Sequence, residues 1–204
     1  MLSRFPLLFI EQHLTSLGGK RINFTPAAID RIFEETIVCT PENGMDFKAF
    51  LDLVIALETL DTKQSLQYFF RILDITRCGK ITPMTISYFY TDVQKELQQA
   101  GWESPTLEDI RGEIYDIAGV NDADGITFKD LLNSGQGRTI CTMLLDVTGF
   151  WQYDNRESLL QEPDGDLEGP VNIAAAGEDK LVLGGHHLEG DDDDDDYYDD
   201  AEFF

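Results

Sequence analysis

The sequence is poor in the residues and motifs on which most catalytic sites rely. Its 204 residues include only three histidines, His13, His186 and His187. It has no Gly-rich phosphate loop, no H-E-x-x-H zinc motif and no G-x-S-x-G nucleophile motif. Residues 1–160 therefore offer no convincing histidine general base. These absences predict a protein that is not an enzyme.

Cysteines are equally scarce. Cys39, Cys78 and Cys141 lie far apart, are odd in number and form no C-x-x-C pair. This spacing excludes a disulfide framework and favours reduced thiols in the protein core. The expected compartment is the cytosol or the nucleus.

Basic residues are also few. The chain has 15 Lys and Arg against 39 Asp and Glu, a formal net charge of −24. Residues 161–204 hold 16 of the acidic residues against one lysine, a net −15, which leaves −9 for residues 1–160. We do not expect the protein to bind nucleic acid, because such binding requires a basic surface.

Long hydrophobic runs are absent. The apolar run near the start, Phe5–Ile10, is interrupted by Pro6 and is too short for a secretory signal. No stretch approaches the roughly 20 apolar residues that a membrane-spanning helix needs. No membrane association is expected.

Apolar residues at helical spacing are abundant and predict an all-α domain over residues 1–160. Residues 4–17 form one expected amphipathic helix. Further buried stripes follow at Ile29, Ile32, Phe33 and Ile37, at Leu66, Phe69, Phe70 and Leu73, at Ile86, Phe89, Tyr90, Val93 and Leu97, and at Leu107, Ile110, Ile114 and Ile117. Residues 46–60 are apolar nearly all round, which predicts a helix buried on several sides.

Three Ser/Thr-Pro pairs mark expected helix starts: Thr25-Pro26, Thr82-Pro83 and Ser104-Pro105. A Ser or Thr side chain caps a helix N-terminus, and proline fits the first helical position. Thr106 and Asp109 form an alternative capping pair for the third helix. Capping accounts for these pairs without a role in phosphorylation.

The segment from Asp74 to Thr85 has the shape of an EF-hand calcium loop. Asp74 stands at the first loop position, Gly79 at the sixth, where the chain turns sharply, and Ile81 at the eighth. The remaining ligand positions 3, 5, 9 and 12 carry Thr76, Cys78, Thr82 and Thr85. One carboxylate is too few to hold calcium well, so we expect a metal-free structural hand.

A second acidic stretch, from residue 116 to 130, is the other metal candidate. Its carboxylates are Asp116, Asp122, Asp124 and Asp130. Ile126 follows Gly125 directly, and the loop is about three residues longer than the standard of twelve. Two interpretations stay open: a weak calcium site, or a distorted hand with solvated acids and Thr127 capping its exit helix.

The end of the domain and the tail differ in composition. Residues 140–147 are an apolar run that fits a helix or a strand, and residues 149–153 supply aromatics expected to fasten the domain end to the core. Residues 154–160 fit a short helix. From Gln161 onward large apolar residues thin out, and the run Asp191–Asp196 follows. We expect a disordered acidic tail over residues 161–204.

The words MDFKAFLDLVIALE, LQYFFRILDI, LLNSGQG and DVTGFWQYDNRESLL occur in this order in the chain. In these words residues 1–160 resemble the B-double-prime regulatory subunits of protein phosphatase 2A, gamma branch, with its plant relative Tonneau/Fass. Members are longer on the N-terminal side, so the resemblance implies a C-terminal part of such a protein. It also implies that Asp74 and Gly79 are remnants of a calcium loop, with Asp116 a weaker first-position candidate.

The resemblance implies an EF-hand-bearing helical protein that acts as a regulatory or scaffolding subunit. The ligand count predicts that its paired EF-hand-like units are degenerate and require no cofactor, with weak calcium binding as the other outcome. Its partners would be the phosphatase catalytic and scaffold subunits, with cytoskeletal or basic proteins as further candidates. The expected place is the cytoplasm, at the centrosome or cortical cytoskeleton, or the nucleus. The alternative is a calcium-binding switch module, which rests on the helix–loop–helix pattern and the acids of residues 116–130.

Overall fold

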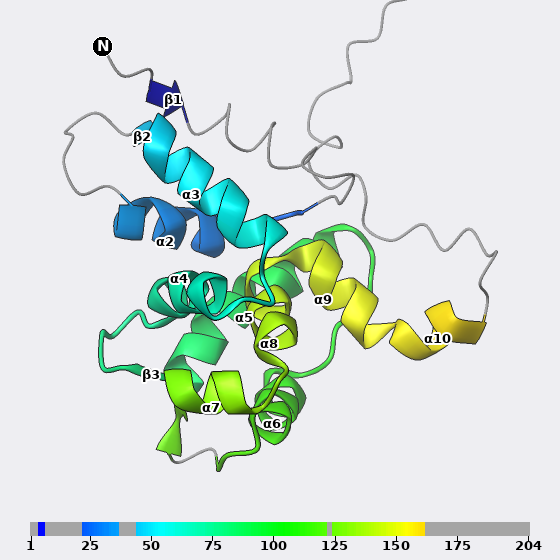
Figure 1. Cartoon of the computed structure of the whole chain (residues 1–204). Coiled ribbons are helices and arrows are strands. Elements are labelled where there is room, and N and C mark those ends of the chain that lie inside the picture. Colours follow the sequence, from blue (N-terminus) through cyan, green and yellow to red (C-terminus); the bar gives the residue numbers. More distant parts are fainter. Residues whose placement is uncertain (1–3, 7–21, 37–43, 122–123, 162–204) are drawn as a thin grey trace, which may run out of the picture.

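The computed structural model describes residues 4–6, 22–36, 44–121 and 124–161, and these form a helical fold with two short antiparallel strand pairs (Figure 1). The all-α class expected from the sequence is confirmed. The helices of the described residues are α2 (Pro26–Thr36), α3 (Phe47–Glu58), α4 (Lys63–Leu73), α5 (Pro83–Gln99), α6 (Leu107–Ala118), α7 (Phe128–Asn133), α8 (Gly137–Leu145), α9 (Val147–Asp154) and α10 (Arg156–Gln161). The strands are β1 (Arg4–Pro6), β2 (Gly44–Asp46), β3 (Lys80–Ile81) and β4 (Ile126–Thr127).

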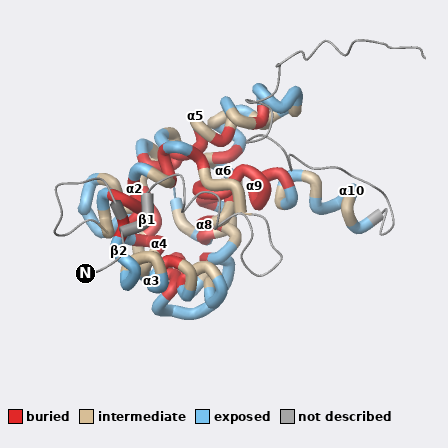
Figure 2. Tube along the Cα trace, turned by 90° about the horizontal axis from the view of Figure 1, so that it is seen from above, coloured by how far each residue is buried: buried red, intermediate tan, exposed pale blue. Residues whose placement is uncertain are grey.

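Helices α4, α5 and α8 form the centre of the molecule. Helix α8 contacts α2, α4, α5, α6 and α9, and α4 also contacts α3 and α7. The buried faces of these helices meet in one continuous hydrophobic core, seen as red tube at the centre of Figure 2. Every apolar position expected on α4 and α5 is buried, from Leu66 to Leu97. For these two helices, the 3.6-residue period of apolar residues correctly predicts the buried face.

Side-chain caps start most helices where the sequence places them. Thr25 Oγ1 accepts a hydrogen bond from Ala28 N at the start of α2, and Thr82 Oγ1 accepts one from Thr85 N at the start of α5. The third expected start, Ser104-Pro105, is wrong. Helix α6 begins after Thr106, which forms a reciprocal capping box with Asp109. The capping pair satisfies two backbone N–H groups and so sets the boundary.

The N-terminal helix expected over residues 4–17 is corrected at its start. Arg4–Pro6 form β1, which pairs antiparallel with β2 so that Phe5 faces Met45. The rest of that expected helix lies outside the described residues. Met45 is buried at 1% exposure, as suits a residue that joins a strand pair to the core.

Helix α3 is not buried on several sides, and this expectation was wrong. It lies on the outside, against α4, with Leu53 and Ala56 facing inward. Phe47, Leu51 and Ile55 remain 46%, 39% and 58% exposed. A helix that is apolar all round offers two equivalent faces, and composition alone does not tell which one packs.

The C-terminal elements settle the open assignments. Of the apolar run at residues 140–147, residues 140–145 are helical and supply most of α8, Asp146 has extended backbone, and Val147 begins α9. Phe150 and Trp151 of α9 are buried, and the Trp151 ring meets Trp102 edge-on with centroids 5.3 Å apart. The aromatics therefore fasten the domain end to the core, as expected. The short helix α10 ends at Gln161, one residue into the segment expected to be tail.

The tail beyond that point, residues 162–204, lies outside the described residues. Within the described segments, no helix combines the length and apolar character needed to cross a lipid bilayer.

Candidate functional site

Two helix–loop–helix units lie side by side in the lower part of Figure 1. The first consists of α4, a loop and α5, and the second of α6, a loop and α7. Their loops are joined by the β3–β4 pair, in which Lys80 faces Thr127 and Ile81 faces Ile126. Both isoleucines are fully buried. The pairing makes the two loops one rigid feature and brings together the two stretches singled out in the sequence.

In the first loop, the Asp74 carboxylate accepts hydrogen bonds from backbone N–H groups of its own loop. Cys78 N donates to Oδ1 at 3.0 Å and Gly79 N donates to Oδ2 at 2.7 Å. Gly79 adopts a φ of 75°, the left-handed conformation that allows the tight turn. Arg77 reaches the same region with a φ of 53°, which is uncommon for a residue with a side chain. The loop shape is therefore held by protein groups.

The remaining ligand positions of the first loop do not gather oxygen atoms. Thr85, at the twelfth position, is buried and takes part in capping α5 with Thr82. The Thr76 hydroxyl donates to Cys78 Sγ at 3.1 Å. A threonine at position 12 is also too short to replace the bidentate glutamate of a calcium loop.

Two cations of the first loop extend away from it. The Arg77 guanidinium lies 3.3 Å from Glu35 of α2, and Glu35 in turn pairs with the buried Arg31 at 2.8 Å. Arg31 Nε donates to the carbonyl oxygen of Ile72 at the end of α4. In the other direction, Lys80 Nζ donates to the carbonyl oxygen of Asp124 in the second loop at 2.8 Å. Neither link is predictable from the sequence, because each depends on a contact between distant segments.

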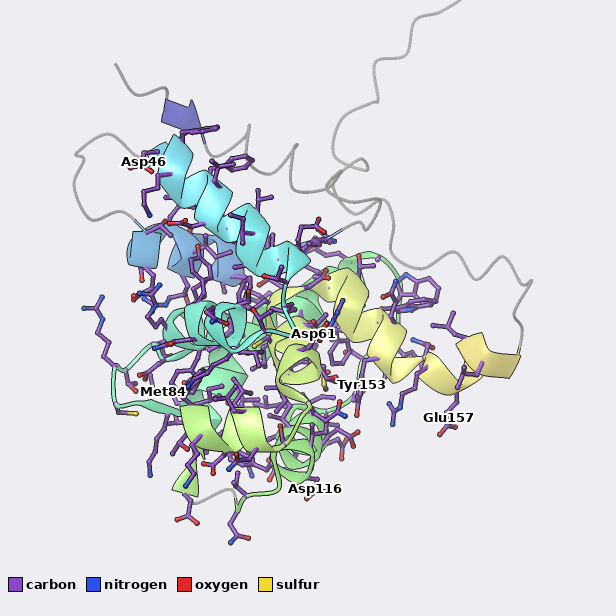
Figure 3. All side chains as sticks on the ribbon, in the orientation of Figure 1. Asp46, Asp61, Met84, Asp116, Tyr153 and Glu157 are labelled. Carbon is purple, nitrogen blue, oxygen red and sulfur yellow. The ribbon has the colours of Figure 1, made fainter. Side chains whose placement is uncertain are left out.

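The acidic candidates of the second stretch have separate positions. Asp116 lies within α6, where Figure 3 shows it at the lower end of the molecule, and Asp122 lies outside the described residues. Asp130 caps α7: its Oδ2 accepts from the Thr127 hydroxyl at 2.6 Å and from Thr127 N at 3.0 Å. These hydrogen bonds, the side-chain one first, lower the Asp130 pKa. Thr127 and Asp130 thus form the capping box that the sequence suggested.

No group of three or more His, Cys, Asp or Glu side chains in the described segments is arranged to hold a metal ion. Gly125, directly before β4, has a φ of 66° and lies against β3. The two loops are paired through β3 and β4, but their carboxylates do not converge on one point. This geometry is suited to holding α4 and α5 against α6 and α7.

The cysteines divide between core and surface. Cys141 of α8 is buried, and burial raises its pKa to about 12. Cys78 is exposed in the first loop, so the expectation of a core thiol is wrong there. Its side chain stays at the loop surface, where Sγ accepts a hydrogen bond from the Thr76 hydroxyl. Cys39 lies outside the described residues.

A buried carboxylate elsewhere was also missed. Asp146 lies at the junction of α8 and α9 and is only 9% exposed. It accepts hydrogen bonds from Asn23 N and Thr148 N. Burial is the main cause of its raised pKa, about 6, although these backbone hydrogen bonds act in the opposite direction. In the sequence, the only sign of this buried carboxylate is a single aspartate within the apolar run at residues 140–147.

Comparison with known proteins gives three informative similarities. The chain is 37% identical over 145 residues to the gamma-type B'' regulatory subunit of serine/threonine-protein phosphatase 2A from Xenopus tropicalis, covering 71% of this chain and 31% of that protein. The human gamma-type protein is also 37% identical, over 147 residues. The probable B'' regulatory protein TON2 of Arabidopsis thaliana is 43% identical over 143 residues, covering 68% of this chain and 30% of that protein.

The chain therefore spans about a third of the length of the curated relatives it matches. Among solved structures, a chain of the PP2A PR70 holoenzyme superposes with a TM-score of 0.60 at 19% identity, covering 71% of this chain and 51% of that chain. At this identity the structural similarity shows the fold alone. No family model matches the sequence.

Proposed function

We propose that this chain, which is a homologue of the gamma-class B'' regulatory subunits and of TON2, acts as a non-catalytic regulatory subunit of a protein phosphatase 2A holoenzyme. The observation that carries the proposal is the identity to both animal and plant subunits over about 70% of the chain. Its partners would be the catalytic and scaffold subunits of the phosphatase. The relatives contain further sequence, so we assign to this chain only a share of their contacts.

The two helix–loop–helix units are, in this proposal, a degenerate EF-hand pair. The supporting features are Asp74 and Gly79 at the first and sixth loop positions and the antiparallel contact of Ile81 with Ile126. Threonine and cysteine at the other ligand positions support a pair that requires no metal. The PR70 holoenzyme structure was described with calcium, which is a property of that protein.

The alternative function, a calcium-operated switch, has less support. A switch of this kind needs an apolar face between its helix pairs that opens to receive a target. In this chain α8 contacts α4, α5 and α6, and Ile140, Cys141 and Leu144 are buried there. The chain thus supplies its own occupant for that face, which favours a static scaffold.

For localisation we propose the cytoplasm, at the centrosome or cortical cytoskeleton, with the nucleus as an alternative. The acidic residues 162–204 are proposed as a disordered tail that can meet basic proteins. Neither proposal depends on the described helices.

The experiment is a pull-down of the purified phosphatase scaffold–catalytic dimer by the full 204-residue chain at low salt. We expect capture that weakens as salt rises, because the chain is strongly acidic. A full-length gamma-class protein serves as positive control, and a Phe69→Ala/Phe70→Ala variant, with two buried rings removed, serves as an unfolded control. Capture by the positive control with none by the intact, folded chain would contradict the proposal.

A further inference from the structure

Lys80 links the two loops in a way that neither loop pattern predicts. It belongs to β3, opposite Thr127 of β4, yet its side chain extends past that pair toward the turn of the second loop. There its ammonium lies 2.8 Å from the carbonyl oxygen of Asp124. A positive charge from the first loop therefore contacts the backbone of the second.

The path of the side chain is defined by Gly125. A Cβ atom at this glycine would lie 3.4 Å from both Cβ and Cδ of Lys80, and 3.2 Å from the carbonyl oxygen of Ile81. Contacts of 3.2 Å are closer than ordinary van der Waals separation, and Gly125 also has a φ of 66°. The aliphatic part of Lys80 thus runs over a position where the chain carries no side chain, and its charged end emerges at Asp124.

The second loop presents negative groups to this ammonium. The carbonyl oxygen of Asp124 accepts its hydrogen bond. The pKa of Asp130 is lowered mainly by the two hydrogen bonds from Thr127, and the charges of Lys129 and then Lys80 act in the same direction with smaller effect. In a calcium-loaded hand, a divalent cation neutralises carboxylates and binds a backbone carbonyl of the loop. Lys80 supplies a cation to the same two kinds of group.

We propose that Lys80 is a built-in cation of the second loop, which replaces the stabilising role of a divalent ion and makes the paired units independent of calcium. The inference rests on the Lys80–Asp124 contact and the close approach at Gly125. It stands whether or not the chain binds a phosphatase.

The chain offers a matched control in Arg77. Arg77 is the other cation of the first loop, but it pairs with Glu35 of α2 and not with the second loop. Lys80→Met and Arg77→Met each remove one positive charge from the same loop and keep the length of the aliphatic side chain. Lys80→Arg keeps both the positive charge and an N–H donor.

The test measures melting temperatures of the full chain and the three variants, in chelator and in millimolar CaCl2. In chelator we expect Lys80→Met to melt lower by about 2–4 °C, a size typical of one lost interaction in a chain of this length. Lys80→Arg should melt with the parent chain, and calcium should raise none of the four melting temperatures, because the described residues offer no group of side chains that could hold it. A cation that binds only the folded variant must stabilise it.

Amide NMR spectra locate the effect: relative to the parent chain, the Gly125 and Ile126 signals should shift in Lys80→Met and keep their positions in Arg77→Met. The proposal is overturned if Lys80→Met melts with the parent chain in chelator, or if calcium raises the melting temperature of the parent chain. It is also overturned if Arg77→Met shifts the Gly125 and Ile126 signals as strongly, since the charge would then act non-specifically.

Discussion

The carboxylate of Asp146 accepts a 2.8 Å hydrogen bond from the backbone N–H of Asn23, a residue 123 positions earlier in the chain. Two backbone hydrogen bonds flank this contact: Val147 N donates to the Asn23 carbonyl at 2.8 Å, and Thr25 N donates to the Leu145 carbonyl at 3.2 Å. Asp146 thereby joins the segment before α2 to the junction of α8 and α9. These contacts hold the start of α2 against the junction of α8 and α9.

The first prediction concerns removal of this carboxylate. Asp146→Ala leaves one buried and one partly buried backbone N–H group, those of Thr148 and Asn23, without their acceptor, and an unsatisfied buried group costs about 1–3 kcal/mol. We expect the free energy of unfolding to fall by about 2 kcal/mol in urea titrations at about pH 4, where the contribution of this group to stability is full. Asp116→Ala, at an exposed site on α6, is the control and should change it by less than about 0.5 kcal/mol.

The second prediction follows from the raised pKa of Asp146, about 6 against an ordinary 3.8. The folded state holds the proton more tightly than the unfolded state, so this group's contribution to stability is full below about pH 4 and is lost as pH rises through about 6. Asp146→Asn does not titrate and resembles the protonated acid in shape. Each pKa unit is worth about 1.4 kcal/mol, so parent stability relative to this variant should fall by up to about 3 kcal/mol between about pH 4 and 7. A difference that stays constant over this range would contradict the assignment.

The third prediction tests which face of α3 is packed. Leu53 is fully buried, whereas Ile55, two residues on, is 58% exposed. Leu53→Ala should cost about 2–5 kcal/mol of unfolding free energy, because it opens a cavity. Ile55→Ala on the same helix should cost less than about 1 kcal/mol. Equal losses would show that the Ile55 side of the helix is covered as well.

These cases show how far the sequence could be used to predict the fold. Single apolar stripes, as on α4 and α5, gave both the helix and its buried face, since only one orientation hides them. Helix α3 failed this logic because its apolar residues occupy most of the circumference. Local caps such as Thr127 with Asp130 were predictable, as both partners lie within one turn.

The candidate site was predictable only in part, for the same physical reason. Loop positions 74, 79 and 81 follow a local spacing rule, and the pairing of Ile81 with Ile126 follows from having two loops. The roles of Lys80 and Glu35 depend on which distant backbone or side chain they meet. Such contacts leave no mark on a single sequence.

The fourth prediction compares two glycines that share the left-handed conformation. Gly125 and Gly119 have φ values of 66° and 68°, so alanine strains both backbones by roughly 1–2 kcal/mol. Only at Gly125 would the new Cβ also meet Ile81 and Lys80; at Gly119 nothing lies within 4 Å. Gly125→Ala should therefore lower the melting temperature more than Gly119→Ala. Equal shifts would mean that the second loop tolerates displacement from β3.

The last prediction separates the helical part from the acidic tail. Truncation after Gln161 removes 16 acidic residues and one lysine, a net −15, and leaves every described helix in place. We expect an unchanged melting temperature and retained capture of the phosphatase dimer, because the core and the words that carry the family resemblance end by Leu160. The salt dependence of capture should become shallower, since most of the net negative charge has gone. Limited proteolysis of the full chain should yield the same fragment, ending near Gln161. A truncated chain that melts normally but captures no phosphatase would instead place part of the binding surface in the tail.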